Sequence, residues 1–139
     1  MLRALTDLAG VSAILVVDDD PSVRVVLRLV LETEGHTVVE APHGKAALEA
    51  IRQHALPDIV TTDLTMPVLG GEQLISHLRS DPATAAIPIV LITGNPDTAR
   101  ALHASGLVEA VVVKPFEAAN VARCIKDLAV NAALRQATA

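Results

Sequence analysis

Short β-branched runs alternate five times with longer segments in which apolar residues recur at helical spacing, and this alternation most constrains the fold. Crossovers between parallel strands are right-handed almost without exception, so the helices must cover both faces of a single sheet. The fold class is therefore α/β, a doubly wound five-stranded parallel sheet with five helices. The predicted strands are residues 11–17, 36–41, 59–62, 87–93 and 110–113; the predicted helices are 21–34, 44–54, a segment around 74–78, 96–104 and 118 to about 133.

Length and composition indicate one domain with an aliphatic core. The chain has 139 residues, 51% of them hydrophobic, yet it contains one Phe and no Trp or Tyr. Single-stranded nucleic acids bind to aromatic platforms and basic grooves. The near absence of aromatic residues argues against the first and the formal charge of −5 against the second, so we expect no direct nucleic-acid binding. We expect a domain over residues 12–130, an N-terminal extension over 1–11 and a C-terminal tail over 131–139.

The only cysteine, Cys124, excludes an internal disulfide and fits a reducing cytoplasm. No apolar run approaches the roughly 18 residues of a membrane-spanning helix. Arg3 and Asp7 interrupt the start of the chain, which therefore lacks the apolar core of a signal peptide. We expect a cytoplasmic protein without a membrane anchor.

Charged side chains follow three of the predicted strands at the point where each strand stops. Asp18, Asp19 and Asp20 follow the first strand, Asp63 the third and Lys114 the fifth. Because the carboxyl ends of parallel strands meet at one edge of a sheet, these groups are expected to lie close together. Carboxylates and a lysine so arranged can surround one divalent cation and one phosphoryl group, which predicts phosphoryl transfer.

Four segments in order resemble the receiver domain of two-component response regulators, over about residues 12–128. They are Ile14-Leu-Val-Val-Asp-Asp-Asp-Pro-Ser-Val-Arg24, Pro57-Asp-Ile-Val-Thr-Thr-Asp-Leu-Thr-Met-Pro67 with Gly70-Gly71, Ile87-Pro-Ile-Val-Leu-Ile-Thr-Gly94 and Lys114-Pro-Phe116. The resemblance implies a flavodoxin-like strand order, 2-1-3-4-5. It also implies a phosphoprotein of a phosphorelay, a signalling domain with self-catalysed phosphotransfer and dephosphorylation rather than an enzyme.

The resemblance also assigns roles to individual residues. Asp63 would accept a phosphoryl group as an aspartyl phosphate, and Asp18, Asp19, Asp63 and the carbonyl of Thr65 would bind Mg²⁺. Lys114, the Thr93 hydroxyl and the Gly94 N–H would contact the phosphoryl oxygens, and Thr65 and Asn95 would flank the path of attacking water. The donor would be a histidine kinase or a histidine phosphotransfer protein.

Some of these residues have simpler interpretations. Asp20 before Pro21 is best explained as the cap of the first helix. None of the five histidines has metal-ligand spacing, so structural or exposed positions are expected for all of them. The likeness to receivers favours a cis peptide bond between Lys114 and Pro115, which is otherwise uncommon.

The chain departs from the receiver pattern at Val111, three residues before the lysine, where receivers usually carry an aromatic side chain. A small, stiff β-branched side chain cannot rotate a ring between solvent and core. We therefore expect phosphorylation to act through Thr93 and the loop at 94–97, with little change at the fourth helix. A second departure is the segment 106–109, one residue longer than the common pattern.

Two other function classes remain open at this point. Asp18-x-Asp20 matches the start of a haloacid-dehalogenase-like phosphatase, although Pro21 and the absence of a suitable later acid disfavour it. A receiver-like binding module that acts without phosphate would keep the fold alone. In either receiver case the signal must leave through a protein-binding surface around the helices at 96–104 and 118–133, to a downstream protein or a second receiver.

Overall fold

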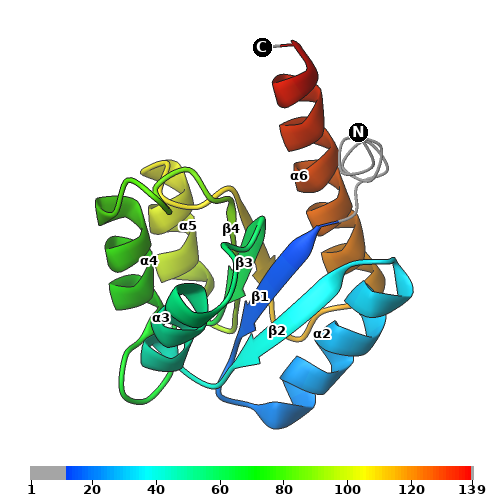
Figure 1. Cartoon of the computed structure of the whole chain (residues 1–139). Helices are drawn as coiled ribbons and strands as arrows, with labels where there is room; N and C mark the ends of the chain where they lie inside the picture. Colours follow the sequence, from blue (N-terminus) through cyan, green and yellow to red (C-terminus); the bar gives the residue numbers. More distant parts are fainter. Residues whose placement is uncertain (1–11, 139) are drawn as a thin grey trace.

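The computed structural model describes residues 12–138 as one parallel sheet between two layers of helices (Figure 1). The order of the strands in the sheet is β2-β1-β3-β4-β5, as expected for a flavodoxin-like fold. The elements are β1 (Ala13–Val17), α2 (Pro21–Thr33), β2 (Thr37–Ala41), α3 (Gly44–Gln53), β3 (Ile59–Thr62), α4 (Gly71–Ser80), β4 (Ile89–Thr93), α5 (Pro96–Ala104), β5 (Ala110–Val113) and α6 (Ala118–Thr138).

The sheet separates two aliphatic cores, because side chains alternate between its faces along each strand. On β1, Ile14 and Val16 enter one core, while Leu15 and Val17 enter the other. Helices α2 and α6 complete the first core, and α3, α4 and α5 complete the second. Three of the five strands, β1, β4 and β5, are almost continuous apolar runs, and all four residues of β3 are buried, as expected of a parallel sheet covered on both faces.

Helix termini follow the predicted signals. The Asp20 side chain accepts the Ser22 N–H at the start of α2, and Gly35, at φ 94°, lies in the turn that ends this helix. His43 caps α3 by accepting the Ala46 N–H. The expectation of structural or exposed histidines is thus met at His43, and His36 is buried against the backbone of Ser12.

The structure corrects the predicted ends of several elements. β4 begins two residues later than predicted, at Ile89, and β1 begins at Ala13, so that Ser12, the first described residue, lies outside the strand. α6 continues past the predicted end near 133, to Thr138, because residues 118–139 contain no Gly or Pro that would end it. The predicted extension at 1–11 lies outside the described residues. Within residues 12–138, no helix combines the length and apolar character needed to cross a membrane.

Candidate phosphoryl-transfer site

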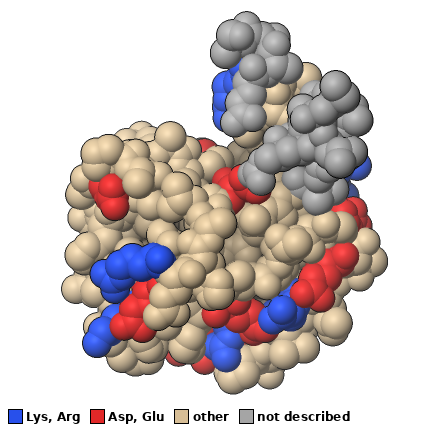
Figure 2. Space-filling model, in the orientation of Figure 1, with Lys and Arg blue, Asp and Glu red and all other residues tan. Residues whose placement is uncertain are grey.

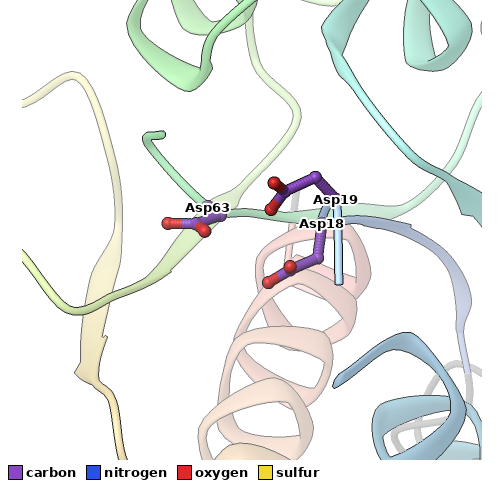
Figure 3. A group of neighbouring side chains, drawn as sticks. All are labelled: Asp18, Asp19 and Asp63. Carbon is purple, nitrogen blue, oxygen red and sulfur yellow. The ribbon is translucent and has the colours of Figure 1, made fainter. Parts of the chain in front are cut away.

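Three carboxylates meet at the carboxyl edge of the sheet. Asp18 and Asp19 follow β1 and Asp63 follows β3; these two strands are neighbours, with Val17 beside Thr62. Each carboxylate offers an oxygen that lies within 4.8 Å of the others, and Figure 3 shows the three side chains gathered at this edge of the sheet. Asp18 and Asp63 are buried whereas Asp19 is exposed, so the cluster opens to solvent on one side.

Lys114 bridges two of these carboxylates from the end of β5. Its Nζ donates to Asp18 Oδ2 at 2.8 Å and to Asp63 Oδ2 at 3.1 Å. Burial raises the pKa of Asp18 above its ordinary value, and hydrogen bonds from Lys114 and from Asp20 oppose that rise. Burial alone would lower the pKa of Lys114, but its bonds to Asp18 and Asp63 raise it instead. The lysine is therefore held in its charged form beside the Asp63 carboxylate.

The backbone around Asp63 is held on both sides. Its N–H donates to Val17 O, and its Oδ1 accepts the N–H of Leu64 at 2.7 Å. The start of α4 packs directly against this turn, because a Cβ at Gly71 would lie 2.1 Å from Asp63 O. Only glycine therefore allows α4 to approach the turn so closely.

Thr93 and Gly94 lie at the same edge, at the end of β4. Thr93 is buried, and its hydroxyl accepts the Asn95 N–H at 3.2 Å. A Cβ at Gly94 would meet nothing within 4 Å, so this position is open. Within residues 12–138, no hydrogen bond joins Thr65, Thr93 or Gly94 to the three carboxylates. The structure thus brings Asp18, Asp19, Asp63 and Lys114 together. The other predicted site residues, Thr65, Thr93 and Gly94, make no hydrogen bond to this group within the described residues.

Residues 14–126 match the response regulator receiver domain as a family. The chain belongs to that family. Its relatives include the chemotaxis protein CheY1 of Helicobacter pylori, 36% identical over 107 residues that cover 74% of this chain and 85% of CheY1. The sensor histidine kinase TmoS of Ectopseudomonas mendocina is 36% identical over 116 residues, which cover 83% of this chain but only 12% of the kinase.

Solved structures agree with this receiver domain in fold. A putative response regulator from Chloroflexus aurantiacus superposes with a TM-score of 0.78 at 32% identity, covering 85% of this chain and 97% of that one. The chemotaxis response regulator CheY4 of Vibrio cholerae gives a TM-score of 0.75 at 28% identity, with 85% and 98% covered. The chain thus carries a receiver domain with an acidic pocket and a lysine, consistent with an aspartyl phosphoacceptor.

The acidic pocket of the receiver domain fits a hard divalent cation. Asp18, Asp19 and Asp63 supply only oxygen ligands, and their carboxylates repel one another at such short separation. Lys114 neutralises one unit of that charge and leaves the pocket anionic. The residues present could therefore hold a metal ion.

The sequence interpretation missed two residues that support this pocket. Arg24 donates from Nη1 to the backbone carbonyl of Asp18 at 2.6 Å and from Nε to Glu40 at 3.2 Å. The only signal in the sequence was the place of Arg24 in the first matching segment, four residues after the cap of α2. Nothing local connects it to Glu40, because Arg24 lies on α2 and Glu40 on β2.

One remaining prediction about the receiver domain is confirmed. The peptide bond between Lys114 and Pro115 is cis. Cys124 is half-buried on α6, and burial, together with the nearby Asp127 carboxylate, raises the pKa of its thiol. A thiol with a raised pKa is a poor nucleophile, in keeping with a structural role.

On the face in Figure 2, basic and acidic side chains are interspersed, and no broad basic patch is present there.

Proposed function

We propose that this protein is a cytoplasmic receiver that accepts a phosphoryl group on Asp63 from a phosphohistidine, in a reaction that requires Mg²⁺. The observation that carries the proposal is the contact of Lys114 with Asp63, beside the two further carboxylates of Asp18 and Asp19. One carboxylate thus has both a fixed cation for phosphoryl oxygens and an anionic pocket for a metal ion next to it. Phosphoryl transfer depends mainly on such positioning and charge stabilisation.

The transfer exchanges one bond to phosphorus for another. An Asp63 carboxylate oxygen forms the new P–O bond while the P–N bond to the partner's imidazole breaks, and the imidazole keeps the electron pair. Mg²⁺, held by Asp18, Asp19, Asp63 and the Thr65 carbonyl, would neutralise charge on the phosphoryl oxygens. Lys114 would leave its bond with Asp63 to pair with one of these oxygens. Later, attack of water on phosphorus releases inorganic phosphate and restores the carboxylate.

Four further residues have supporting roles in this proposal. The Thr93 hydroxyl and the Gly94 N–H would donate to the phosphoryl group, and the open space at Gly94 leaves room for it. Thr65 and Asn95 would flank the path of water and so affect how long the phosphorylated state lasts. Neither side chain is a base, so we expect geometry and access of water to set that lifetime.

The partners follow from the chemistry of a receiver. The phosphoryl donor would be a histidine kinase or a histidine phosphotransfer protein, and TmoS, one of the relatives, is itself a sensor histidine kinase. The output would be a change of the surface formed by α5, β5 and α6, read by a downstream protein or a second receiver. Val113, the last residue of β5, exposes 45% of its surface.

Switching would differ from receivers with an aromatic side chain in place of Val111. Val111 is only partly exposed and, like Leu102 of α5, packs against one of the two cores. We expect the phosphorylated state to move Thr93 and residues 94–97 while the surface near Val111 stays nearly unchanged. Crystal structures with and without a beryllofluoride mimic of the phosphoryl group would test this, and full rearrangement near Val111 would refute it.

The phosphoacceptor proposal is tested by intact-protein mass spectrometry after incubation with acetyl phosphate and Mg²⁺. Wild type should gain one phosphoryl group, and the gain should be absent in Asp63→Asn and after addition of EDTA before the donor. Asp81→Asn is a matched control, because Asp81 is exposed and lies at the far end of α4. Labelling of Asp63→Asn equal to that of wild type would refute the assignment of Asp63.

The alternative of a binding module without phosphate predicts no labelling of the folded protein by either acetyl phosphate or a phosphohistidine donor. The haloacid-dehalogenase-like alternative needs Asp20 as an acid and base. The Asp20 side chain instead caps α2 by accepting the Ser22 N–H, which leaves that alternative without its second aspartate.

A further inference from the structure

Every polar backbone and side-chain group of Asp18 has a hydrogen-bond partner. Its N–H donates to Ala41 O of β2 at 3.1 Å, Oδ1 accepts the Asp20 N–H at 2.9 Å, and Oδ2 accepts Lys114 Nζ at 2.8 Å. Its carbonyl oxygen accepts Arg24 Nη1 at 2.6 Å, the shortest of the four. Three of these bonds hold Asp18 itself, whereas the fourth acts on the peptide group that leads to Asp19.

The fourth bond matters because β1 ends at Val17 and no strand fixes the peptide group between Asp18 and Asp19. That peptide group is planar, so holding its carbonyl oxygen also sets the direction in which the Asp19 Cα lies. Asp19 is exposed, and within residues 12–138 its carboxylate makes no hydrogen bond. The position of this carboxylate therefore depends on its backbone.

Arg24 is itself held in place. Its Nε donates to Glu40 Oε1 at 3.2 Å, and Arg28 Nη1 holds the other oxygen of Glu40 at 2.7 Å. The Arg24 side chain is only 16% exposed. Glu40 immediately precedes Ala41, whose carbonyl accepts the Asp18 N–H. The contacts thus form a closed loop from Asp18 through Arg24 and Glu40 back to Asp18.

We infer that Arg24 is a positioning residue for the metal site. Its guanidinium orients the peptide group between Asp18 and Asp19, so that the Asp19 carboxylate faces Asp63 in the pocket before a cation binds. The inference rests on the proposed function in that it takes the three carboxylates as the cation ligands. It adds a residue that touches neither the cation nor the phosphoryl group, and whose effect on cation affinity runs through Asp19.

Electrostatics alone predicts the opposite effect of removing Arg24. A guanidinium near a cation site repels the cation, so its loss would leave affinity unchanged or increase it, with Glu40 reducing the size of this effect. A positioning role predicts weaker binding instead. The sign of the change in Mg²⁺ affinity therefore distinguishes the two effects.

The test is the dissociation constant for Mg²⁺ of the unphosphorylated protein, measured by calorimetry at fixed pH and ionic strength. Arg24→Met should weaken binding about tenfold, the lower end of what groups supporting metal ligands usually contribute. Arg24→Lys, which keeps the charge but cannot reach Asp18 and Glu40 with a planar fork, should weaken it less. Arg28→Met is the matched control: it loses a bond to the same Glu40 but none to Asp18, and should bind Mg²⁺ within about twofold of wild type.

A merely structural role is excluded by a double-mutant cycle with Asp19→Asn. If Arg24 acts through Asp19, the Arg24→Met change should have little effect on Mg²⁺ affinity once the Asp19 carboxylate is gone. Unchanged or tighter binding by folded Arg24→Met, or an equal loss in both backgrounds, would overturn the inference. If Arg24→Met does not fold, Arg24→Lys supplies the same cycle. If wild type itself binds no Mg²⁺, the proposed function fails, whereas normal binding by both wild type and Arg24→Met removes only this inference.

Discussion

Replacement of Lys114 by Met should lower the stability of the metal-free protein by about 2 kcal/mol, and much less when Mg²⁺ is present. The substitution keeps the length of the side chain and removes two charge-assisted hydrogen bonds, to Asp18 and Asp63. It leaves three carboxylates within 4.8 Å of one another and no bound cation among them. The stability of the metal-free variant is therefore reduced by carboxylate repulsion.

The magnitude follows from the geometry. Hydrogen bonds to charged groups contribute about 1.5–3 kcal/mol each, so two of them set an upper limit of about 6 kcal/mol. The Lys114 side chain is 24% exposed, which screens the interaction, and one carboxyl of the pair can take up a proton in the variant. These two effects reduce the expected loss to about 2 kcal/mol, or about 6 °C in Tm for a chain of this size.

The assay is urea unfolding followed by circular dichroism, since the chain has no Trp or Tyr, with wild type and variant each in EDTA and in Mg²⁺. Lys114 and Mg²⁺ would share the same anionic groups, so the variant should bind Mg²⁺ more tightly than wild type and gain more stability from it. Exposed Lys126, changed to Met, is the control and should alter stability by less than about 0.5 kcal/mol. An equal loss in EDTA and in Mg²⁺ would mean that Lys114 stabilises by packing rather than by charge, and would refute the reasoning.

Three further predictions concern other positions. Burial lowers the pKa of His36 in the folded protein, so the unfolded chain takes up a proton first as pH falls. The free energy of unfolding should therefore decrease as pH drops below about 6.5. Urea midpoints measured across this range should change less in His36→Gln than in wild type. Gly71→Ala places a Cβ 2.1 Å from Asp63 O and should lower the free energy of unfolding by about 3 kcal/mol, measured by thermal unfolding. Gly94→Ala is the control, because its Cβ meets no atom within 4 Å and should lower stability far less. Similar losses in the two variants would contradict the close packing of α4. Val68 has φ 68°, a left-handed conformation that a β-branched residue adopts poorly and Asn tolerates, and it is 70% exposed. Val68→Asn should therefore raise the free energy of unfolding by about 1 kcal/mol. A lower Tm of the variant would show that this backbone conformation is not strained.

The sequence was sufficient to predict the fold because each element carries its own local signal. Three elements were predicted with their observed ends: the strands at 59–62 and 110–113 and the helix at 96–104. Each has a charged residue, a proline or a glycine at or near its ends. The end of α6 was missed because no such residue follows it. Ends without a chemical signal depend on packing, which the local sequence does not reveal.

The candidate site was predictable in its acidic pocket and lysine for the same reason. Asp18, Asp63 and Lys114 each follow a strand, and the parallel order alone brings the ends of these strands together. Arg24 of α2 could not be assigned in this way, because its role depends on a backbone carbonyl oxygen and on Glu40 of β2. Backbone acceptors carry no signature of residue type, so a side chain that binds one looks like any other surface arginine in the sequence.

The segment 106–109 illustrates this limit and bears on how the protein would switch. Arg79 of α4 donates to Leu107 O at 3.0 Å and to Glu109 Oε1 at 2.9 Å, and the same Glu109 oxygen accepts the Ile89 N–H at 2.6 Å. The segment after α5 is therefore fastened to α4 and to the start of β4. The opposite end of α5 is capped by Asn95, whose N–H donates to the Thr93 hydroxyl at the site. A movement of Thr93 would therefore act on the N-terminal end of α5, while the segment beyond its C-terminal end is held by Arg79 and Ile89. This arrangement favours a local response near residues 94–97 over a displacement of the whole helix.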